Sequence, residues 1–352
     1  MTPTDLVQWL AERPAPLAEV LRHIAAACAQ IGRAAARGAI DGSLAGLPGS
    51  LNPQGEVPNR LDQWADACMA RELGDCPQVA GWASEEQPAA VPSPEHGSRG
   101  AYLVAYDPLD GSSNLEPNGA VGTIFSVLPH LFRGTPASDC AFMQPGRRQV
   151  AAGYAIYGPA TVLVLSTGQG VDMFTLDPDD RSPAGRWLLT RAAVQVPAQT
   201  GEFAINAANQ RFWEKPVQRY VAECLSGQNG PRGRDFNMRW VASMVAEMHR
   251  IFTRGGIFLY PRDNKEPFKP GRLRLLYEVA PMAWLMHQAG GAASSGTSPI
   301  LELVPDALHQ KVPAILGSRD EVERVASYHA DPSENVSWQL FKTRGLFVQP
   351  NA

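Results

Sequence analysis

Apolar residues recur along the chain at two spacings, one typical of helices and one typical of strands. From Leu17 to Ala36 they follow helical spacing in an Ala-rich stretch that Gly38 ends. Residues 61–73 show the same periodicity, whereas residues 77–83 and 101–106 are short apolar runs typical of strands. The first third of the chain therefore predicts a mixture of helices and strands.

The rest of the chain continues this mixture. We expect further strands at residues 121–128, 150–166, 171–176, 256–260 and 273–276, and further helices at residues 240–252 and 280–289. Residues 87–100 contain prolines and glycines typical of an exposed loop, and a weakly marked domain boundary lies near residue 195. The pattern predicts an α/β or α+β architecture.

Composition and charge exclude two kinds of partner. The 352 residues include 31 Lys and Arg against 35 Asp and Glu, a net charge of −4, with no basic run that would neutralise a nucleic-acid backbone. The most apolar window, residues 150–165, is broken by glycines and a proline and is too short to span a bilayer. The first residues have no cationic segment leading into an apolar one, so we expect neither a secretory signal nor a membrane anchor.

The five cysteines are widely spaced, and none forms a Cys-x-x-Cys pair. This spacing favours neither a zinc site nor a redox couple. We therefore expect reduced thiols that pack in the core of a cytoplasmic protein, because a free cysteine behaves as a small hydrophobic residue.

The densest chemical signal is YDPLDGSSN at residues 106–114, where a predicted strand enters a loop. Pro108 fixes its own φ and disfavours helix at Asp107, so Asp107 and Asp110 can be held on a rigid bend as two oxygen ligands. Gly111 permits a backbone conformation that would turn the following N–H groups inward as an anion-binding nest. An ordinary Asp-Gly turn with capping serines is the alternative that these residue types leave open.

A second pair of carboxylates, Glu85 and Glu86, follows the predicted strand at residues 77–83. Successive side chains on an extended chain point to opposite sides, so one carboxylate can ligate a metal while the other faces an attacking water. Taken alone, two adjacent glutamates are most often a solvated surface feature.

Together these segments resemble class I fructose-1,6-bisphosphatase, within the Li⁺-sensitive, inositol-monophosphatase-like phosphatase superfamily. The resemblance covers residues 31–328 and rests on DPLDGSSN (107–114), GTIFSV (122–127), RWVASMVAEMHR (239–250), GGIFLYP (255–261) and GRLRLLYE (271–278). It implies a sugar-phosphatase fold of alternating helix and sheet layers with two subdomains. Residues 1–195 would carry most metal ligands, residues 196–328 would bind the sugar phosphate, and residues 329–352 would form a tail of unknown purpose.

The resemblance also implies a set of metal ligands. These are the carboxylates of Glu85, Asp107, Asp110 and Glu278, the backbone carbonyl of Leu109, and Glu56, which stands where the family has an Asp near a further metal. Mg²⁺ suits an all-oxygen set because it is a hard cation with octahedral geometry. Two or three Mg²⁺ per subunit are expected, with Mn²⁺ as a substitute.

The remaining implied site residues bind water and substrate. Glu86 and Asp62 would orient and deprotonate the attacking water. The N–H groups of Gly111, Ser112 and Ser113 would hold the 1-phosphate, and Asn206, Tyr260, Arg239, Arg272 and Met244 would surround the sugar and its 6-phosphate. Among the basic residues of the C-terminal half, only Arg239 and Arg272 receive a role. Arg239 would come from a neighbouring subunit of a homotetramer.

The implied activity is Mg²⁺-dependent hydrolysis of the 1-phosphate of D-fructose 1,6-bisphosphate, in gluconeogenesis or the Calvin cycle. Trp240 and Asn209 replace tyrosines of the family, and Arg272 replaces a lysine, so sedoheptulose 1,7-bisphosphate stays open as an additional or alternative substrate. A non-catalytic sugar-phosphate sensor is the alternative from another class. The family's AMP site is not intact, because Ala101 precedes Tyr102 where a lysine is expected and no Gly-Glu-Leu-Thr segment occurs near the start.

Overall fold

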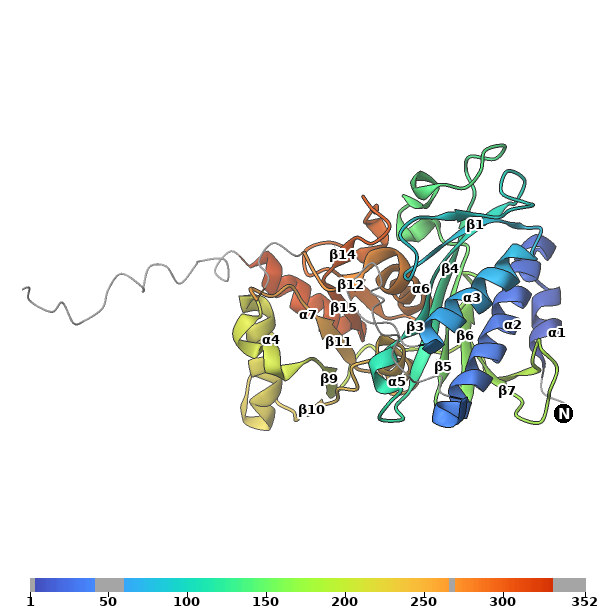
Figure 1. The fold of residues 1–352 in the computed structure, drawn as a ribbon. Helices are drawn as coiled ribbons and strands as arrows, with labels where there is room; N and C mark the ends of the chain where they lie inside the picture. The colour runs from blue at the N-terminus through green and yellow to red at the C-terminus, as the bar shows by residue number, and fades with distance from the viewer. Residues whose placement is uncertain (1–3, 42–59, 266–269, 332–352) are drawn as a thin grey trace, which may run out of the picture.

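The computed structural model describes residues 4–41, 60–265 and 270–331, in which layers of helix and sheet alternate (Figure 1). The first outer layer contains helices α1 (Leu6–Ala11), α2 (Ala15–Arg37) and α3 (Arg60–Gly74), which cover one face of a large sheet. Helices α5 (Met244–Arg254) and α6 (Ala280–Gln288) lie between this sheet and a smaller one, and α4 (Lys215–Leu225) and α7 (Arg319–Ala330) cover the far side of the smaller sheet. The expected α/β layering is therefore confirmed.

The large sheet has eight strands in the order β2-β1-β3-β4-β5-β6-β7-β8. Their bounds are β1 (Val79–Ser84), β2 (Val91–Pro92), β3 (Tyr102–Asp110), β4 (Val121–Pro129), β5 (Ala151–Tyr157), β6 (Thr161–Ser166), β7 (Asp172–Leu176) and β8 (Trp187–Arg191). Strands β1 and β3 run parallel, with Ser84 opposite Tyr106, and the other neighbouring pairs are antiparallel. The carboxyl ends of β1 and β3 consequently meet at one edge of the sheet.

The smaller sheet has the order β10-β9-β11-β15-β13, and β12 pairs separately with β14. The bounds are β9 (Glu202–Ala204), β10 (Asn237–Met238), β11 (Ile257–Tyr260), β12 (Leu273–Arg274), β13 (Ala292–Ser294), β14 (Lys311–Val312) and β15 (Ala314–Gly317). Short 3₁₀ turns occupy Gly38–Asp41, Ser112–Asn114, Asp139–Phe142, Gly146–Arg148, Ala207–Phe212, Gly227–Asn229 and Ile300–Glu302, and a π-helical turn spans Leu275–Val279.

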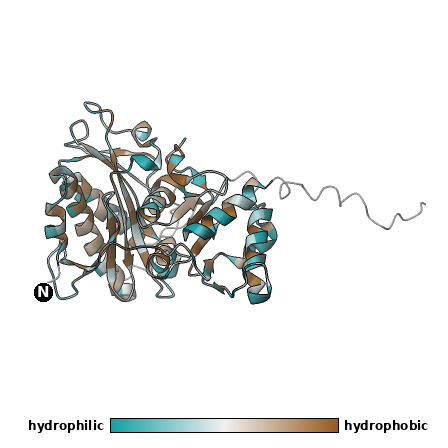
Figure 2. Ribbon diagram, turned by 180° about the vertical axis from the view of Figure 1, so that it is seen from behind, coloured by the Kyte–Doolittle hydropathy of each residue, from teal (hydrophilic) through white to brown (hydrophobic). Residues whose placement is uncertain are grey.

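The two faces of the smaller sheet bury different residues, as the period of a strand requires. Ile257 and Leu259 pack toward α4 and α7, whereas Phe258 between them packs toward α5 and α6. The large sheet is likewise buried on both faces, and Figure 2 shows its strands coloured mainly as apolar. Burial of this apolar surface away from water is the main interaction that holds the layers together.

Several boundaries differ from the prediction. The helix expected from Trp240 starts at Met244, because Ser243 caps it by accepting a hydrogen bond from Ala246 N. The strand expected at residues 273–276 ends at Arg274 and continues as the π-helical turn. The predicted loop at residues 87–100 includes the short edge strand β2.

Two further expectations concern the cysteines and membranes. All five cysteines are free, and four are buried as expected, but Cys140 is exposed and does not pack in a core. Among the described residues, none of the helices has both the length and the apolar character needed to cross a bilayer.

A buried ionic cluster joins α7 to the segment after α4. Glu321, only 1% exposed, accepts hydrogen bonds from Arg232 at 2.6 and 2.7 Å, from Arg234 at 2.9 Å and from the Tyr220 hydroxyl at 2.7 Å. The Arg232 side chain is itself 4% exposed. Removing one member of a buried pair leaves the other charge without compensation in a poorly solvated place.

We therefore predict that Glu321→Gln lowers the free energy of unfolding by about 3–5 kcal/mol. Urea denaturation followed by circular dichroism measures this change. The control is Glu323→Gln on the same helix, where the side chain is exposed and the expected change stays within about 0.5 kcal/mol. Equal effects of the two substitutions would contradict the assignment of Glu321 to a buried cluster.

Candidate active site

The parallel pairing of β1 and β3 brings two acidic residues side by side. Ser84 lies opposite Tyr106, and Glu85 N donates to Tyr106 O at 3.1 Å, so Glu85 and Asp107 are the next residues along both strands. Both carboxylates are buried. Their side chains are close enough to share a hydrogen bond.

We expected strand β3 to end before Asp107, but it continues through Asp110 with an irregularity. Asp107 pairs with Ile124 and Asp110 pairs with Gly122, so β3 advances three residues while β4 advances two. In a regular strand, side chains three residues apart point to opposite faces, and one extra residue returns them to the same face. The two carboxylates therefore converge because of a bulge, which bends the strand locally between them. The predicted end of the strand at residue 106 is wrong, because β3 continues to Asp110.

Side-chain hydrogen bonds stabilise this bulge. Asp107 Oδ1 accepts from Leu109 N at 2.9 Å, and the Thr123 hydroxyl on β4 donates to Pro108 O at 2.8 Å. Pro108 has no N–H, so its nitrogen requires no acceptor within the sheet. The local sequence thus favours an interruption of the ladder between the two aspartates.

Glu278 reaches the same point from the π-helical turn after β12. One oxygen each of Asp107, Asp110 and Glu278 lies within 4.8 Å of the others, and all three residues are buried. Glu278 Oε2 accepts from Arg274 N at 2.6 Å. Three carboxylate oxygens at this spacing form a donor set that suits a hard divalent cation such as Mg²⁺.

Burial dominates the electrostatics of this cluster. It raises the pKa of Glu85 to about 8, and the neighbouring Glu278 adds to the shift. It raises the pKa of Asp110 to about 7, again with Glu278 as the second cause, and it raises the pKa of Asp107 well above its usual range with Glu85 as the second cause. The pKa of Glu278 is raised by burial and is lowered in part by Arg274. A bound cation would relieve the repulsion that these shifts report.

Arg274 is the buried counter-charge of the cluster. Its Nη1 lies 2.8 Å from Glu85 Oε1 and 3.5 Å from Glu278 Oε2. The sequence analysis gave Arg274 no role, although its position four residues before Glu278 is the spacing at which helical side chains meet.

The turn after Asp110 has the expected left-handed residue. Gly111 has φ +74°, and a Cβ built on it would lie 2.6 Å from Ser243 Cβ. Asn114 N then donates to Gly111 O at 2.8 Å to close the 3₁₀ turn. Ser112 in this turn is half-buried and Ser113 is exposed.

Helix α3 presents acidic residues to the same region. Asp62 in its first turn is buried, and Asp66 one turn later accepts hydrogen bonds from the Tyr106 hydroxyl at 2.9 Å and from Gln87 Nε2 at 2.6 Å. Glu86, between β1 and Gln87, is half-buried. Asp66 was missed in the sequence analysis, although the helical spacing from Asp62 to Asp66 was a visible signal.

The residues expected at the 6-phosphate lie around the end of β11. Asn206, Asn209 and Tyr260 line a shared small hollow. Asn206 also caps the following 3₁₀ turn by accepting from Ala208 N at 3.1 Å. The Arg272 Nε donates to Asp263 Oδ2 at 3.2 Å, close enough for Arg272 to affect the pKa of Tyr260, which burial raises.

The RWVASM segment contains three residues discussed above for the substrate site, and each of them has different surroundings. The ring of Trp240 stacks on Phe258 with centroids 6.1 Å apart. Arg239 is half-exposed and pairs with Glu202 at 3.5 Å. Met244 is 3% exposed and packs in the core between the sheets, which leaves little of its side chain to line a sugar site in this chain. Glu56 lies outside the described residues.

Most of the chain is similar to known protein families. The family profile described as "Fructose-1-6-bisphosphatase, N-terminal domain" matches residues 8–192, and the one described as "Fructose-1-6-bisphosphatase, C-terminal domain" matches residues 196–330. A class 1 fructose-1,6-bisphosphatase of Methylibium petroleiphilum is 73% identical over 352 residues, which is all of both chains. That of Hydrogenophilus thermoluteolus is 51% identical, over 98% of this chain and 97% of that protein.

Solved structures agree with these matches. The holo form of Leishmania major fructose-1,6-bisphosphatase superposes with a TM-score of 0.87 at 33% identity, over 94% of this chain and 100% of that one. The apo form gives a TM-score of 0.81 at 31% identity over the same shares. Two profiles that together span most of the chain, a full-length relative at high identity and a shared fold establish that this chain belongs to the fructose-1,6-bisphosphatase family.

Proposed function

We propose that this chain hydrolyses the 1-phosphate of D-fructose 1,6-bisphosphate to give fructose 6-phosphate and phosphate. The observation that carries the proposal is the meeting of Asp107, Asp110 and Glu278 at one buried point. A sugar-phosphate sensor would be free to lose this costly cluster, because a cluster of buried acids does not stabilise the fold by itself. Relatives named as fructose-1,6-bisphosphatases support the same substrate.

The metal would be Mg²⁺, two or three per subunit, with Mn²⁺ as a substitute. Asp107, Asp110, Glu278 and Glu85 would hold it through carboxylate oxygens and Leu109 through its carbonyl, with Glu56 serving a further ion. When bound, Mg²⁺ neutralises charge on the transferred phosphoryl group and lowers the pKa of a coordinated water.

The chain's own groups would then place and deprotonate the reactants. Glu86 and Asp62 would take the proton of the attacking water, and no covalent intermediate on the protein is required. The N–H groups of residues 111–113 would bind the 1-phosphate. This role is supported by the left-handed Gly111, which begins a tight turn at the end of β3.

The opposite end of the substrate would lie near β11. Asn206, Tyr260 and Arg272 would bind the 6-phosphate beside Met244, and Arg239 would do so from a neighbouring subunit of a homotetramer. The half-exposed Arg239 side chain supports a role outside its own subunit. Residues 1–195 and 196–328 would form the two domains, and a cytoplasmic location in gluconeogenesis or the Calvin cycle fits the free cysteines.

Release of inorganic phosphate from fructose 1,6-bisphosphate tests the proposal directly. We expect turnover in Mg²⁺ and none in EDTA. Binding of the sugar phosphate without turnover in Mg²⁺ would support the sensor instead. Trp240, which stands where the family has a tyrosine, stacks on Phe258 beside Tyr260 at the proposed sugar-phosphate end. We therefore propose that kcat/KM also be measured for sedoheptulose 1,7-bisphosphate.

Glu86→Gln should lower kcat by about 10²–10⁴-fold with a smaller effect on KM, because the amide cannot accept the proton of the attacking water. Steady-state kinetics in saturating Mg²⁺ measures the change. Glu95→Gln, at an exposed position nine residues away, is the control. A kcat equal to that of the parent protein would remove Glu86 from the mechanism.

Metal affinity should rise with pH. The pKa of Asp110 is raised to about 7 and that of Glu85 to about 8, so below these values the cation must displace protons before it binds. We expect Mg²⁺ to bind about tenfold or more tightly at about pH 9 than at about pH 6. Calorimetric titration across this range measures the trend, and an affinity independent of pH would contradict it.

AMP should not inhibit the enzyme at micromolar concentration. Ala101, the residue before β3, lacks the cationic side chain that the family's nucleotide site uses, and residues 2–29 lack its phosphate-binding segment. Phosphate release measured over a series of AMP concentrations checks this expectation. Half-inhibition in the micromolar range would show that the chain binds AMP by other residues.

A further inference from the structure

The segment that joins β10 to α5, residues 239–243, is held on both sides by side chains that belong to other parts of the chain. On one side Asn114, from the turn after Gly111, donates its amide hydrogens to Val241 O at 3.1 Å and Ala242 O at 3.4 Å. On the other side the carboxylate of Glu247 accepts from Val241 N at 2.6 Å. The middle of the segment is therefore held by Glu247 of α5 and by Asn114 of the turn after Gly111.

Glu247 is 0% exposed and is fully engaged. Its Oε1 accepts from Val241 N, and its Oε2 accepts from Arg250 Nη2 at 3.0 Å and Arg250 Nε at 3.4 Å. Burying a carboxylate costs free energy even when it is paired and hydrogen-bonded, so stabilising the fold is a poor explanation for a glutamate at this position.

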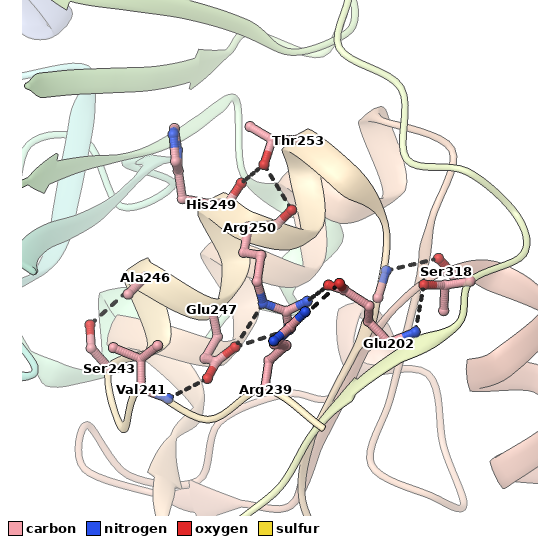
Figure 3. Close-up of polar contacts among 12 residues, drawn as sticks. Glu202, Arg239, Val241, Ser243, Ala246, Glu247, His249, Arg250, Thr253 and Ser318 are labelled. Carbon is pink, nitrogen blue, oxygen red and sulfur yellow. Dashed lines mark hydrogen bonds and ion pairs between the residues drawn. The ribbon is translucent and has the colours of Figure 1, made fainter. Parts of the chain in front are cut away.

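Arg250 extends the network to the smaller sheet and back to the segment, as Figure 3 shows. Its Nη1 donates to Glu202 Oε2 on β9 at 2.6 Å, and Glu202 Oε1 lies 3.5 Å from Arg239 Nε. A ring of alternating charges is thus formed by Glu247, Arg250, Glu202 and Arg239. It begins and ends in the segment 239–243. A ring closed in this way restricts both Arg239 and Val241.

The far end of the segment touches the acidic cluster. The Ser243 hydroxyl donates to Asp110 Oδ2 at 3.0 Å, and Val245 N donates to the same oxygen at 2.9 Å. Between Val241 and Ser243, Ala242 has φ +60°, a conformation that costs free energy for a residue with a Cβ. The contacts on both sides hold this strained residue in place.

We propose that Glu247 is a positioning residue for the metal site and acts on Asp110 through Val241, Ala242 and Ser243. By fixing Val241 N, Glu247 keeps Ala242 in its left-handed conformation and so keeps Ser243 and Val245 on Oδ2 of Asp110. The other carboxylate oxygen is then aimed at the cluster with Asp107 and Glu278. The inference rests on the proposed function, because it takes Asp110 to be a metal ligand.

Direct binding of Mn²⁺, followed by electron paramagnetic resonance without substrate, tests the inference. Glu247→Gln preserves shape but has one acceptor oxygen in place of two, so it cannot serve both Val241 N and Arg250. We expect Mn²⁺ affinity to fall about tenfold or more, as it does when a group that orients a ligand is lost. Ser243→Ala should weaken Mn²⁺ by a similar factor, and it tests the same link if Glu247→Gln does not fold.

The double variant separates positioning from a merely structural role. If Glu247 acts through this segment, then Glu247→Gln added to Ser243→Ala should weaken Mn²⁺ binding by less than the product of the two single effects. The hydroxyl contact to Asp110 is then already lost and only that of Val245 N remains. The matched control is Glu223→Gln on α4, where the carboxylate pairs with Arg219 and accepts from Tyr328 at 2.6 Å, far from the cluster in sequence. Thermal midpoints of all variants report stability independently of binding.

The outcomes distinguish this inference from the function on which it rests. A parent chain that binds no Mn²⁺ overturns the metal site and this inference together. Normal Mn²⁺ binding by Ser243→Ala, or Glu247→Gln with a lower thermal midpoint and unchanged Mn²⁺ affinity, overturns the inference alone. Multiplicative effects in the double variant would also overturn it, because they would mean that the two residues act separately.

Discussion

Mutual repulsion among buried carboxylates is the constraint on which the rest of this structure depends. Asp107, Asp110 and Glu278 bring acidic oxygens to one point that water hardly reaches, and Glu85 lies beside them. Such an arrangement raises the pKa of each group and opposes folding unless a positive charge compensates it. Arg274 supplies part of that charge from within the chain. The negative charge that Arg274 leaves uncompensated indicates what the site can bind, which is a hard cation and, beside that cation, a phosphate.

Each layer of the fold contributes one element to this point. The parallel pair β1 and β3 supplies Glu85 and Asp107, and the bulge in β3 supplies Asp110. The π-helical turn between β12 and α6 supplies Glu278, and the start of α5 holds Asp110 through Ser243. The site therefore lies where the two halves of the chain meet, and the packing of the layers determines its geometry.

Much of this could be predicted from the sequence, and the limits have physical causes. Helical and strand periodicity located α2, α3 and most strands, and the DPLDGSSN motif located the acidic centre, because these signals are local. The bulge was not predicted, since it depends on the register between β3 and β4. Arg274 and Glu247 were missed for a related reason. Their roles follow from burial next to residues distant in sequence, and their residue types alone suggest solvated charges.

Gly111 illustrates how two unrelated requirements can coincide at one residue. Its left-handed backbone would suffice to explain a glycine, but its missing side chain also leaves room for Ser243, 132 positions later in the sequence, to approach the main chain of the turn. A methyl group there would separate α5 from the end of β3 even if the torsion angles were tolerated. The helix that orients Asp110 and the turn that follows Asp110 are therefore in van der Waals contact at a place where neither can move without the other.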